Sequence, residues 1–303
     1  MKAPLPMRGG VNPSRLYLPR DGQWSDLLSF LLERFPYMPA DIIKARLAAG
    51  EMVNTEGVPF SLDSAFEAHS WLWYYREVPD EVRVPFDIDV LYQDKHLLAV
   101  DKPHFLASVP SGRYVQETVL SRLRKQFGLA EISPIHRLDR ETAGVLLFSL
   151  RPEDRGAYQS LFQSRQVTKY YEAIAPTVDG LDFPLVYQSH LVKSPQYFTM
   201  IEVDKPSNSE TKISILKRGS HLSHYFLEPL SGRKHQLRVH MNALGMPICH
   251  DSFYPVLGEM READDFNNPL QLLARAIEFK DPMTGQQRRF ESRRELALLS
   301  DVS

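Results

Sequence analysis

Alternating polar and apolar residues recur through the middle of this chain and limit the folds open to it. Such alternation is typical of half-buried antiparallel strands. Strand-like runs lie at 88–92, 97–100, 145–150, 169–175, 197–203, 211–216 and 222–227. Helical periods at 117–127 and 152–166 interrupt them. The pattern predicts an α+β domain in which helices flank a central mixed, mostly antiparallel sheet.

The first eighty residues follow a different pattern. Residues 1–20 are rich in proline, glycine and arginine and predict a flexible N-terminal arm. Two short helical patterns follow at 24–35 and 39–49, and then a turn at Glu56-Gly57 and a strand near 71–75. We therefore expect a small α/β module at 21–80, a proline-bounded linker, and one large domain at 84–303.

Composition narrows the class of protein. One cysteine, Cys249, rules out a disulfide framework and suits a reducing compartment. No apolar run approaches the length of a membrane span, and the first residues lack the apolar stretch of a signal peptide. A cytoplasmic protein that makes no membrane contact is expected, with a monomer as the default state.

The formal net charge of −2 does not by itself indicate a nucleic-acid-binding protein. The basic residues are unevenly placed, however, and a local basic surface can hold phosphates despite an acidic remainder. Two basic clusters stand out, one at 113–125 and one at 212–238, and solvated charged faces that bind nothing are the alternative for each. Their members are Arg113, Arg122, Arg124 and Lys125, and Lys212, Lys217, Arg218, Arg233, Lys234 and Arg238.

The segment 136–144, with the sequence HRLDRETAG, carries the chemistry. Asp139 lies between Arg137 and Arg140, directly before the apolar run at 145–148, which predicts a buried strand. The two arginines would favour the ionised carboxylate. A structural ion pair at a strand entrance is the alternative reading of this segment alone.

A second segment supplies a cation that needs a partner. Residues 234–244 fit a helix whose apolar face carries Leu237, Met241 and Leu244. Arg238 lies beside that face, so we expect it to be partly desolvated and paired with an anion. Asp139 is the obvious candidate.

Four segments together resemble the RluA-type pseudouridine synthases, which isomerise selected uridines of RNA. The family's central motif is HRLD followed by a Thr-Ser-Gly-like triplet, and this chain has HRLDRETAG at 136–144. Residues 232–240, GRKHQLRVH, resemble its GRxHQxRxH segment. KYYEA at 169–173 matches KxYxA, and DPMTG at 281–285 resembles its closing HPxTG element. The four motifs occur in the family's order.

The resemblance implies a pseudouridine synthase catalytic domain and assigns roles to residues. Asp139 would act on the ribose, either by adding to the sugar carbon or by removing a sugar proton. Arg238 would pair with Asp139, and Tyr171 would stack on the target base or help exchange its C5 proton. Arg137 would take the place of the flipped uridine, because the reacting atoms are inaccessible inside a stacked helix. The other substrate-binding candidates are His136, which we expect to brace its loop, Leu272 as the apolar floor under the uracil, and Arg233, His235 and Gln236.

The partner implied is RNA, a stem-loop of rRNA or tRNA, with no cofactor and no metal, since isomerisation imports no group. Residues 21–80 loosely resemble an alpha-L RNA-binding module whose basic helix is reduced to Lys44 and Arg46. A purely structural appendage is the alternative.

Other functions fit less well. A kinase loop would need a glycine-rich phosphate loop and a DFG motif, which are absent. The histidines and cysteine at 221–250 match no standard zinc spacing. A glycosidase needs a second carboxylate beside Asp139, for which Glu141 is the only near candidate. A non-catalytic RNA-binding relative of the same fold remains the alternative from another class.

Overall fold

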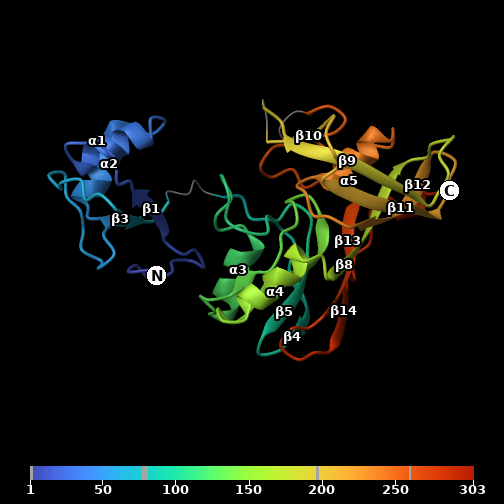
Figure 1. Cartoon of the computed structure of the whole chain (residues 1–303), viewed down its shortest axis with the longest axis horizontal. Coiled ribbons are helices and arrows are strands. Elements are labelled where there is room, and N and C mark those ends of the chain that lie inside the picture. The colour runs from blue at the N-terminus through green and yellow to red at the C-terminus, as the bar shows by residue number, and fades with distance from the viewer. Residues whose placement is uncertain (1–2, 77–80, 196–197, 259–260) are drawn as a thin grey trace. The chain divides into compact units, whose positions relative to one another are not determined.

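The computed structural model describes residues 3–76, 81–195, 198–258 and 261–303 (Figure 1). The chain forms two compact units, one of Met1–Asp80 with Arg124–Ala130, the other of Glu81–Leu123 with Glu131–Ser303. The elements of the first eighty residues are β1 (Ser14–Leu18), α1 (Leu27–Arg34), α2 (Ala40–Ala48), β2 (Met52–Val53) and β3 (Ser70–Tyr74). Both expected helices are therefore confirmed.

The small unit is a three-stranded antiparallel sheet, ordered β1-β3-β2, with α1 and α2 on one face. Leu18, Leu72 and Met52 point to that face and pack with the helices in a common core. The helix expected from 24 begins at Leu27, because the Asp26 side chain caps it by accepting from the Ser29 amide at 2.7 Å. The flexible arm predicted for 1–20 was wrong for residues 14–18, whose backbone pairs with β3.

The remaining elements lie within residues 84–303, the range predicted for the large domain. Its helices are α3 (Val119–Phe127), α4 (Arg155–Gln163), α5 (Gln236–Ala243) and the 3₁₀ turn η1 (Leu299–Asp301). Its strands are β4 (Asp89–Gln93), β5 (Leu97–Lys102), β6 (Ser133–Pro134), β7 (Ala143–Ser149), β8 (Val167–Pro176), β9 (Leu185–Lys193), β10 (Met200–Val203), β11 (Ser209–Lys217), β12 (Leu222–Pro229), β13 (Leu272–Lys280) and β14 (Gln287–Glu291).

These strands form one mixed sheet. Its order is β10-β9-β11-β12-β8-β13-β7-β5-β4, with β14 on β13 and β6 on β7. β13 and β7 run parallel, and the other neighbours are antiparallel. The predicted α+β class is thus confirmed. The strands β6, β9, β13 and β14 were not expected. β10 begins at Met200, and residue 197, within the strand predicted there, lies outside the described residues.

Strand β8 shows how the sheet creates a site. Its odd-numbered residues share one face. Val167 packs with α4 in one core cluster, whereas Ala173 packs with α5 in another. Lys169 and Tyr171 lie between these two and line a pocket on the same face. Two helices therefore cover the ends of this strand and leave its middle open.

Gly144 ends the HRLDRETAG segment for a steric reason. It has a φ of +113°, and a Cβ there would lie 2.2 Å from the Ala274 carbonyl oxygen. Only glycine lets β7 approach the β13 backbone this closely. The glycine therefore fixes the strand that follows Asp139.

Candidate active site

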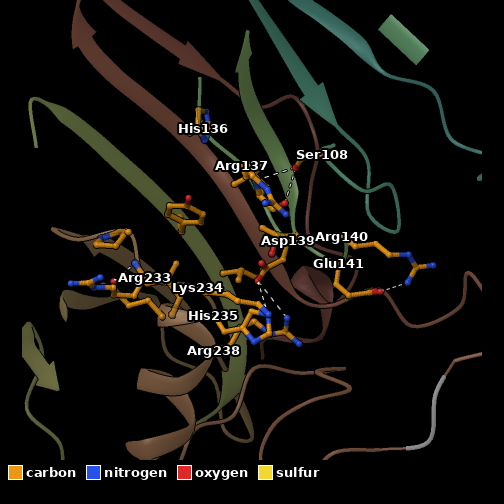
Figure 2. Close-up of a pocket in the computed structure, with 18 of the residues that line it drawn as sticks. Ser108, His136, Arg137, Asp139, Arg140, Glu141, Arg233, Lys234, His235 and Arg238 are labelled. Atoms are coloured by element: carbon orange, nitrogen blue, oxygen red, sulfur yellow. Dashed lines mark hydrogen bonds and ion pairs between the residues drawn. The ribbon is translucent and has the colours of Figure 1, made fainter. Parts of the chain in front are cut away.

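The Asp139 carboxylate lies in the loop between β6 and β7, on the wall of a large open pocket (Figure 2). Its side chain is 29% exposed, so it is accessible to a ligand. The Arg238 Nη1 atom lies 3.5 Å from Asp139 Oδ2, although the two residues are 99 positions apart in the chain. The predicted pairing of these two residues is confirmed.

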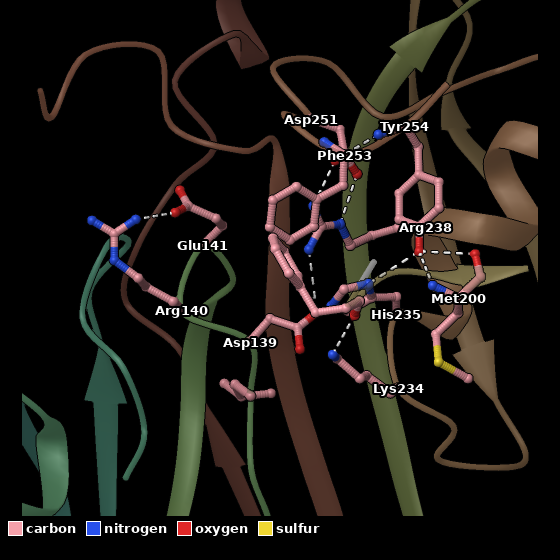
Figure 3. A network of polar contacts seen from close by, with 12 residues as sticks. Asp139, Arg140, Glu141, Met200, Lys234, His235, Arg238, Asp251, Phe253 and Tyr254 are labelled. Carbon is pink, nitrogen blue, oxygen red and sulfur yellow. Dashed lines mark hydrogen bonds and ion pairs between the residues drawn. The ribbon is translucent and has the colours of Figure 1, made fainter. Parts of the chain in front are cut away.

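Arg238 has a closer partner that we did not expect. Its Nε and Nη2 atoms donate to the two oxygens of Asp251 at 2.7 and 2.5 Å (Figure 3). Arg238 is 1% exposed and the Asp251 side chain is fully buried. Burial alone would lower the pKa of the guanidinium, but the Asp251 carboxylate outweighs it, and the pKa is raised above its ordinary value. Asp251 therefore holds Arg238 charged and in place.

His235 forms the other side of this arrangement. It has a left-handed backbone, with a φ of 54°, and precedes α5. Its Nε2 atom lies 3.8 Å from Asp139 Oδ2, and its Nδ1 atom lies 3.0 Å from the Tyr254 hydroxyl. Burial lowers the pKa of His235 to about 4, so the ring is neutral near pH 7. The Tyr254 hydroxyl in turn accepts from the Met200 amide at 2.8 Å.

The two arginines beside Asp139 in the sequence play other parts. Arg140 pairs with Glu141 and stacks over the Tyr114 ring at 4.9 Å. Arg137 is exposed at the pocket wall. Within the described residues neither forms an ion pair with Asp139, so the cation in direct contact with this carboxylate is Arg238.

Three side chains before the motif hold its backbone. Lys102, fully buried, donates from Nζ to the carbonyls of Arg140, Leu106 and Pro103 at 3.0, 2.7 and 2.9 Å. The Ser108 hydroxyl donates to the Leu138 carbonyl at 2.7 Å and accepts from the Leu138 amide at 3.1 Å. His104 Nδ1 lies 2.6 Å from the Glu141 carbonyl oxygen. These residues fix the peptides on either side of Asp139.

Sequence reasoning did not assign Lys102, Ser108, Asp251 or Tyr254 to the site. The Asp101-Lys102-Pro103 segment was a visible signal for the first of these. Asp251 and Tyr254 lie in the segment CHDSFY at 249–254, where an acid shortly before two aromatic residues was equally visible. Their partners are distant in sequence, so the pairing itself could not be deduced.

Tyr171 and Leu272 lie in the pocket as expected. Tyr171 is held by the core beneath α5, and burial together with the Asp139 charge raises the pKa of its hydroxyl well above the ordinary value. Within the described part of the chain, no protein group hydrogen-bonds to that hydroxyl. Leu272 is 3% exposed and lines the pocket from β13.

Two predicted substrate contacts are used inside the protein instead. Gln236 is buried, and its amide is fully engaged: it accepts from Ser231 Oγ and the Arg233 amide and donates to Glu210 and Thr211. His136 accepts from the Leu147 amide at 3.2 Å and stacks on Phe162. Burial lowers the pKa of His136 to about 3. Both residues therefore brace the loops around Asp139.

The pocket has a basic rim. Its exposed or half-buried cations are Arg113, Arg137, Arg140, Arg165, Lys169, Arg233, Lys234 and Arg261. Only some members of the two basic clusters predicted from the sequence contribute to this rim. Others form ion pairs instead: Lys212 with Glu228, Arg218 with Asp179 and Arg122 with Glu117. The local positive charge needed for phosphates is thus present around Asp139 despite the net charge of −2.

The comparisons with known proteins agree with this site. A model of the RNA pseudouridylate synthase family matches residues 96–243. The dual-specificity RNA pseudouridine synthase RluA of Vibrio vulnificus is 35% identical over 206 residues, covering 64% of this chain and 78% of that protein. Its namesake from Haemophilus influenzae is 31% identical over 213 residues, covering 68% and 93%. The chain belongs to the RNA pseudouridine synthase family.

This RNA pseudouridine synthase is therefore an isomerase that acts on uridine in RNA. Among solved structures, human RNA pseudouridylate synthase domain containing 1 matches with a TM-score of 0.56 and 23% identity, covering 72% of this chain and 86% of that one. At that identity the match supports the fold. The relatives are named as synthases, and nothing in these comparisons favours a non-catalytic RNA-binding relative.

Two further observations concern the alternatives. Within the described residues, no three His, Cys, Asp or Glu side chains are grouped so that they could hold a metal ion. His224 contacts Glu172, His240 contacts Thr211, and His250 contacts the Pro269 carbonyl. Across the same part of the chain, no helix combines the length and apolarity that crossing a bilayer requires.

Proposed function

We propose that Asp139, Tyr171 and Arg238 carry out the isomerisation and that the substrate is a stem-loop of rRNA or tRNA. The single observation that carries the assignment is the 3.5 Å contact between Arg238 and Asp139 in a pocket that also contains Tyr171 and Leu272. The names of the relatives, dual-specificity synthases, support either class of RNA.

In the proposed reaction, the N1–C1′ bond of uridine breaks and a C5–C1′ bond forms. C5 loses its proton and N1, freed from the sugar, gains one, so protons balance and no group and no electrons are imported. Asp139 acts at the ribose, as a nucleophile at C1′ or as a base for a sugar proton. Arg238, held by Asp251, keeps the carboxylate ionised and oriented.

The base has to leave the RNA stack to reach Asp139. Leu272 provides an apolar floor for the uracil, and the Tyr171 ring packs against it with a hydroxyl free to contact the base. Arg137, exposed at the pocket wall, fills the space that the uridine leaves. The rim residues Arg233 and Lys234 neutralise flanking phosphates.

The domain division stays part of this proposal, with residues 84–303 as the catalytic domain and residues 21–80 as an appended module. The alpha-L-like mode of RNA binding loses one of its two cations, because Arg46 is 6% exposed and pairs with Glu51. The proposal also includes a cytoplasmic location and a monomeric state, and the cytoplasm is where rRNA and tRNA substrates are found.

Position-by-position mapping of pseudouridine in total RNA tests the proposal. A strain that lacks the gene is complemented with the wild-type chain or with Asp139→Asn. We expect at least one rRNA or tRNA uridine to be modified only with the wild-type chain. Identical maps for the deletion strain and both complemented strains would contradict it.

A further inference from the structure

The outer face of the small sheet carries a row of aromatic rings and arginines. Trp71 and Trp73 in β3 share that face with Arg15 and Tyr17 in β1, as the register Tyr17↔Trp71 and Arg15↔Trp73 requires. Tyr75 continues the row beyond β3. We call these residues, with Arg8, the aromatic stripe. The core and both helices occupy the opposite face.

Each end of the stripe holds a cation over a ring. The Arg15 guanidinium carbon lies 4.5 Å from the centre of the Trp71 ring, and that of Arg8 lies 4.0 Å from the centre of the Tyr75 ring. Tyr17 packs against Trp71 with ring centres 5.0 Å apart and is 37% exposed. Trp73 is only 5% exposed and supports the stripe from within. Tyr17, Trp71 and Tyr75 therefore form its accessible, preordered surface, which arginines overlie.

The charges of the module are segregated. Arg8 and Arg15 are exposed, and within the described residues neither forms an ion pair with a carboxylate. β1 and β3 contain no acidic residue. The acids of the module lie in its helices and connecting segments, as with Asp26, Glu33 and Asp41. The stripe therefore presents unpaired positive charge beside aromatic faces.

We propose that the aromatic stripe binds single-stranded RNA. Ring faces accept unstacked bases of any sequence, and guanidinium groups stack on bases or contact phosphates. A duplex hides its base faces, so duplex RNA would gain only the charge contribution. The proposal deepens the proposed function and rests on it, because it adds an RNA contact in the other unit of the chain, on the sheet rather than on the helices of the module.

The test compares two matched double variants of the full chain. Arg15→Ser with Tyr17→Ser removes an exposed arginine and an exposed tyrosine from the stripe. Arg34→Ser with Tyr37→Ser removes the same pair of residue types from the helical side, where Tyr37 is 76% exposed. The probe is a fluorescein-labelled oligocytidylate of about twelve nucleotides, comparable to the site size of single-strand binders. It contains no uridine, so binding is measured without turnover.

The stripe variant is expected to raise the Kd for oligocytidylate about tenfold or more, from the loss of one stacking site and one cation. The helical-side variant is expected to change this Kd by less than about twofold. For a duplex RNA of equal charge, we expect only a small change of Kd in either variant. Equal losses in the two variants, an unchanged Kd in the stripe variant, or an equal loss for duplex RNA would overturn the proposal.

Folding of each variant is checked by thermal melting. Two further variants test the proposal in case the double serine variant does not fold. Arg15→Glu alters one exposed side chain and should also weaken oligocytidylate binding, whereas Arg15→Lys with Tyr17→Phe keeps charge and ring and should bind nearly as the wild-type chain does. Wild-type affinity in Arg15→Glu would refute the proposal. Because the probe cannot be isomerised, these results stand or fall separately from pseudouridine formation.

Discussion

The guanidinium of Arg238 forms a two-point hydrogen-bonded pair with the Asp251 carboxylate, at 2.7 and 2.5 Å. Its remaining Nη1 atom is presented to Asp139 at 3.5 Å. A fixed cation beside a partly exposed carboxylate is what the proposed chemistry needs, because Arg238 orients Asp139 through one contact and leaves its other oxygen free of this guanidinium.

Asp251→Asn is expected to reduce kcat by roughly a hundredfold with little change in RNA affinity. Loss of the Asp251 charge frees Arg238 to pair more closely with Asp139, and removing one partner of a buried pair costs several kcal/mol of stability. Single-turnover pseudouridine formation and a thermal melt provide the measurements. Asp179→Asn, which breaks an exposed pair with Arg218, is the control and should leave both unchanged. Wild-type kcat in Asp251→Asn would count against this role.

Tyr171→Phe is expected to reduce product formation by about a hundredfold or more while RNA affinity stays near the wild-type value. The ring is held by the core beneath α5, so its packing survives, and only the hydroxyl that faces the pocket is lost. Rate and binding are measured separately on the same RNA. Full activity in Tyr171→Phe would show that the ring alone suffices and that the hydroxyl takes no part in the reaction.

The pH dependence of turnover should report on Lys102. Its three carbonyl acceptors match the three N–H groups of an ammonium, and burial lowers its pKa to about 7, against the raising effects of Glu141 and Asp139. Deprotonation removes one donor from the Asp139 loop, so kcat should fall as pH rises through about 7. Burial holds the pKa of His104 and His235 at about 4, so neither ring titrates there.

Lys102→Met is the matching variant, since it keeps the length and removes the charge. It should show a lower kcat without the fall above pH 7. An unchanged pH profile in Lys102→Met would assign the titration to another group.

Stability at low pH should depend on Glu172, on the sheet face opposite the pocket. Burial would raise the pKa of Glu172, but His224 and Arg275 outweigh it and bring it to about 2. Because the folded pKa lies below the unfolded value, the stabilisation is present above about pH 4.5 and is lost as pH falls toward 2. Glu172→Gln should cost roughly 2–3 kcal/mol near pH 7 and much less near pH 3. A cost independent of pH, measured by urea unfolding, would contradict this.

The fold could be predicted where the pattern is local. Period-2 alternation located most strands of the large sheet, and helical period located all five α-helices, α1 to α5. The arm at 1–20 was misjudged because β1 is short, and its apolar residues Leu16 and Leu18 become informative only beside Leu72. That segment forms a strand because it pairs with β3, which is distant in the sequence.

The site could be predicted where a motif included a reactive side chain and its neighbouring sequence indicated where that side chain lies in the fold. Asp139 and Arg238 were expected to meet, and they do. The bidentate partner of Arg238 and the residues that anchor the Asp139 loop were not predicted. Asp251 and Lys102 contact groups that are distant from them in the sequence, so no local motif reveals the pairing. Gln236 looked like a substrate contact because the sequence cannot show that its amide is already satisfied.

The most direct test of the account is the turnover of a mapped substrate RNA by Asp139→Asn. The variant removes the negative charge and keeps the size of the side chain. We predict no detectable pseudouridine in a single-turnover assay, with RNA affinity within about threefold of the wild-type value, since the basic rim and pocket are unchanged. Pseudouridine formation at the wild-type rate by Asp139→Asn would contradict it.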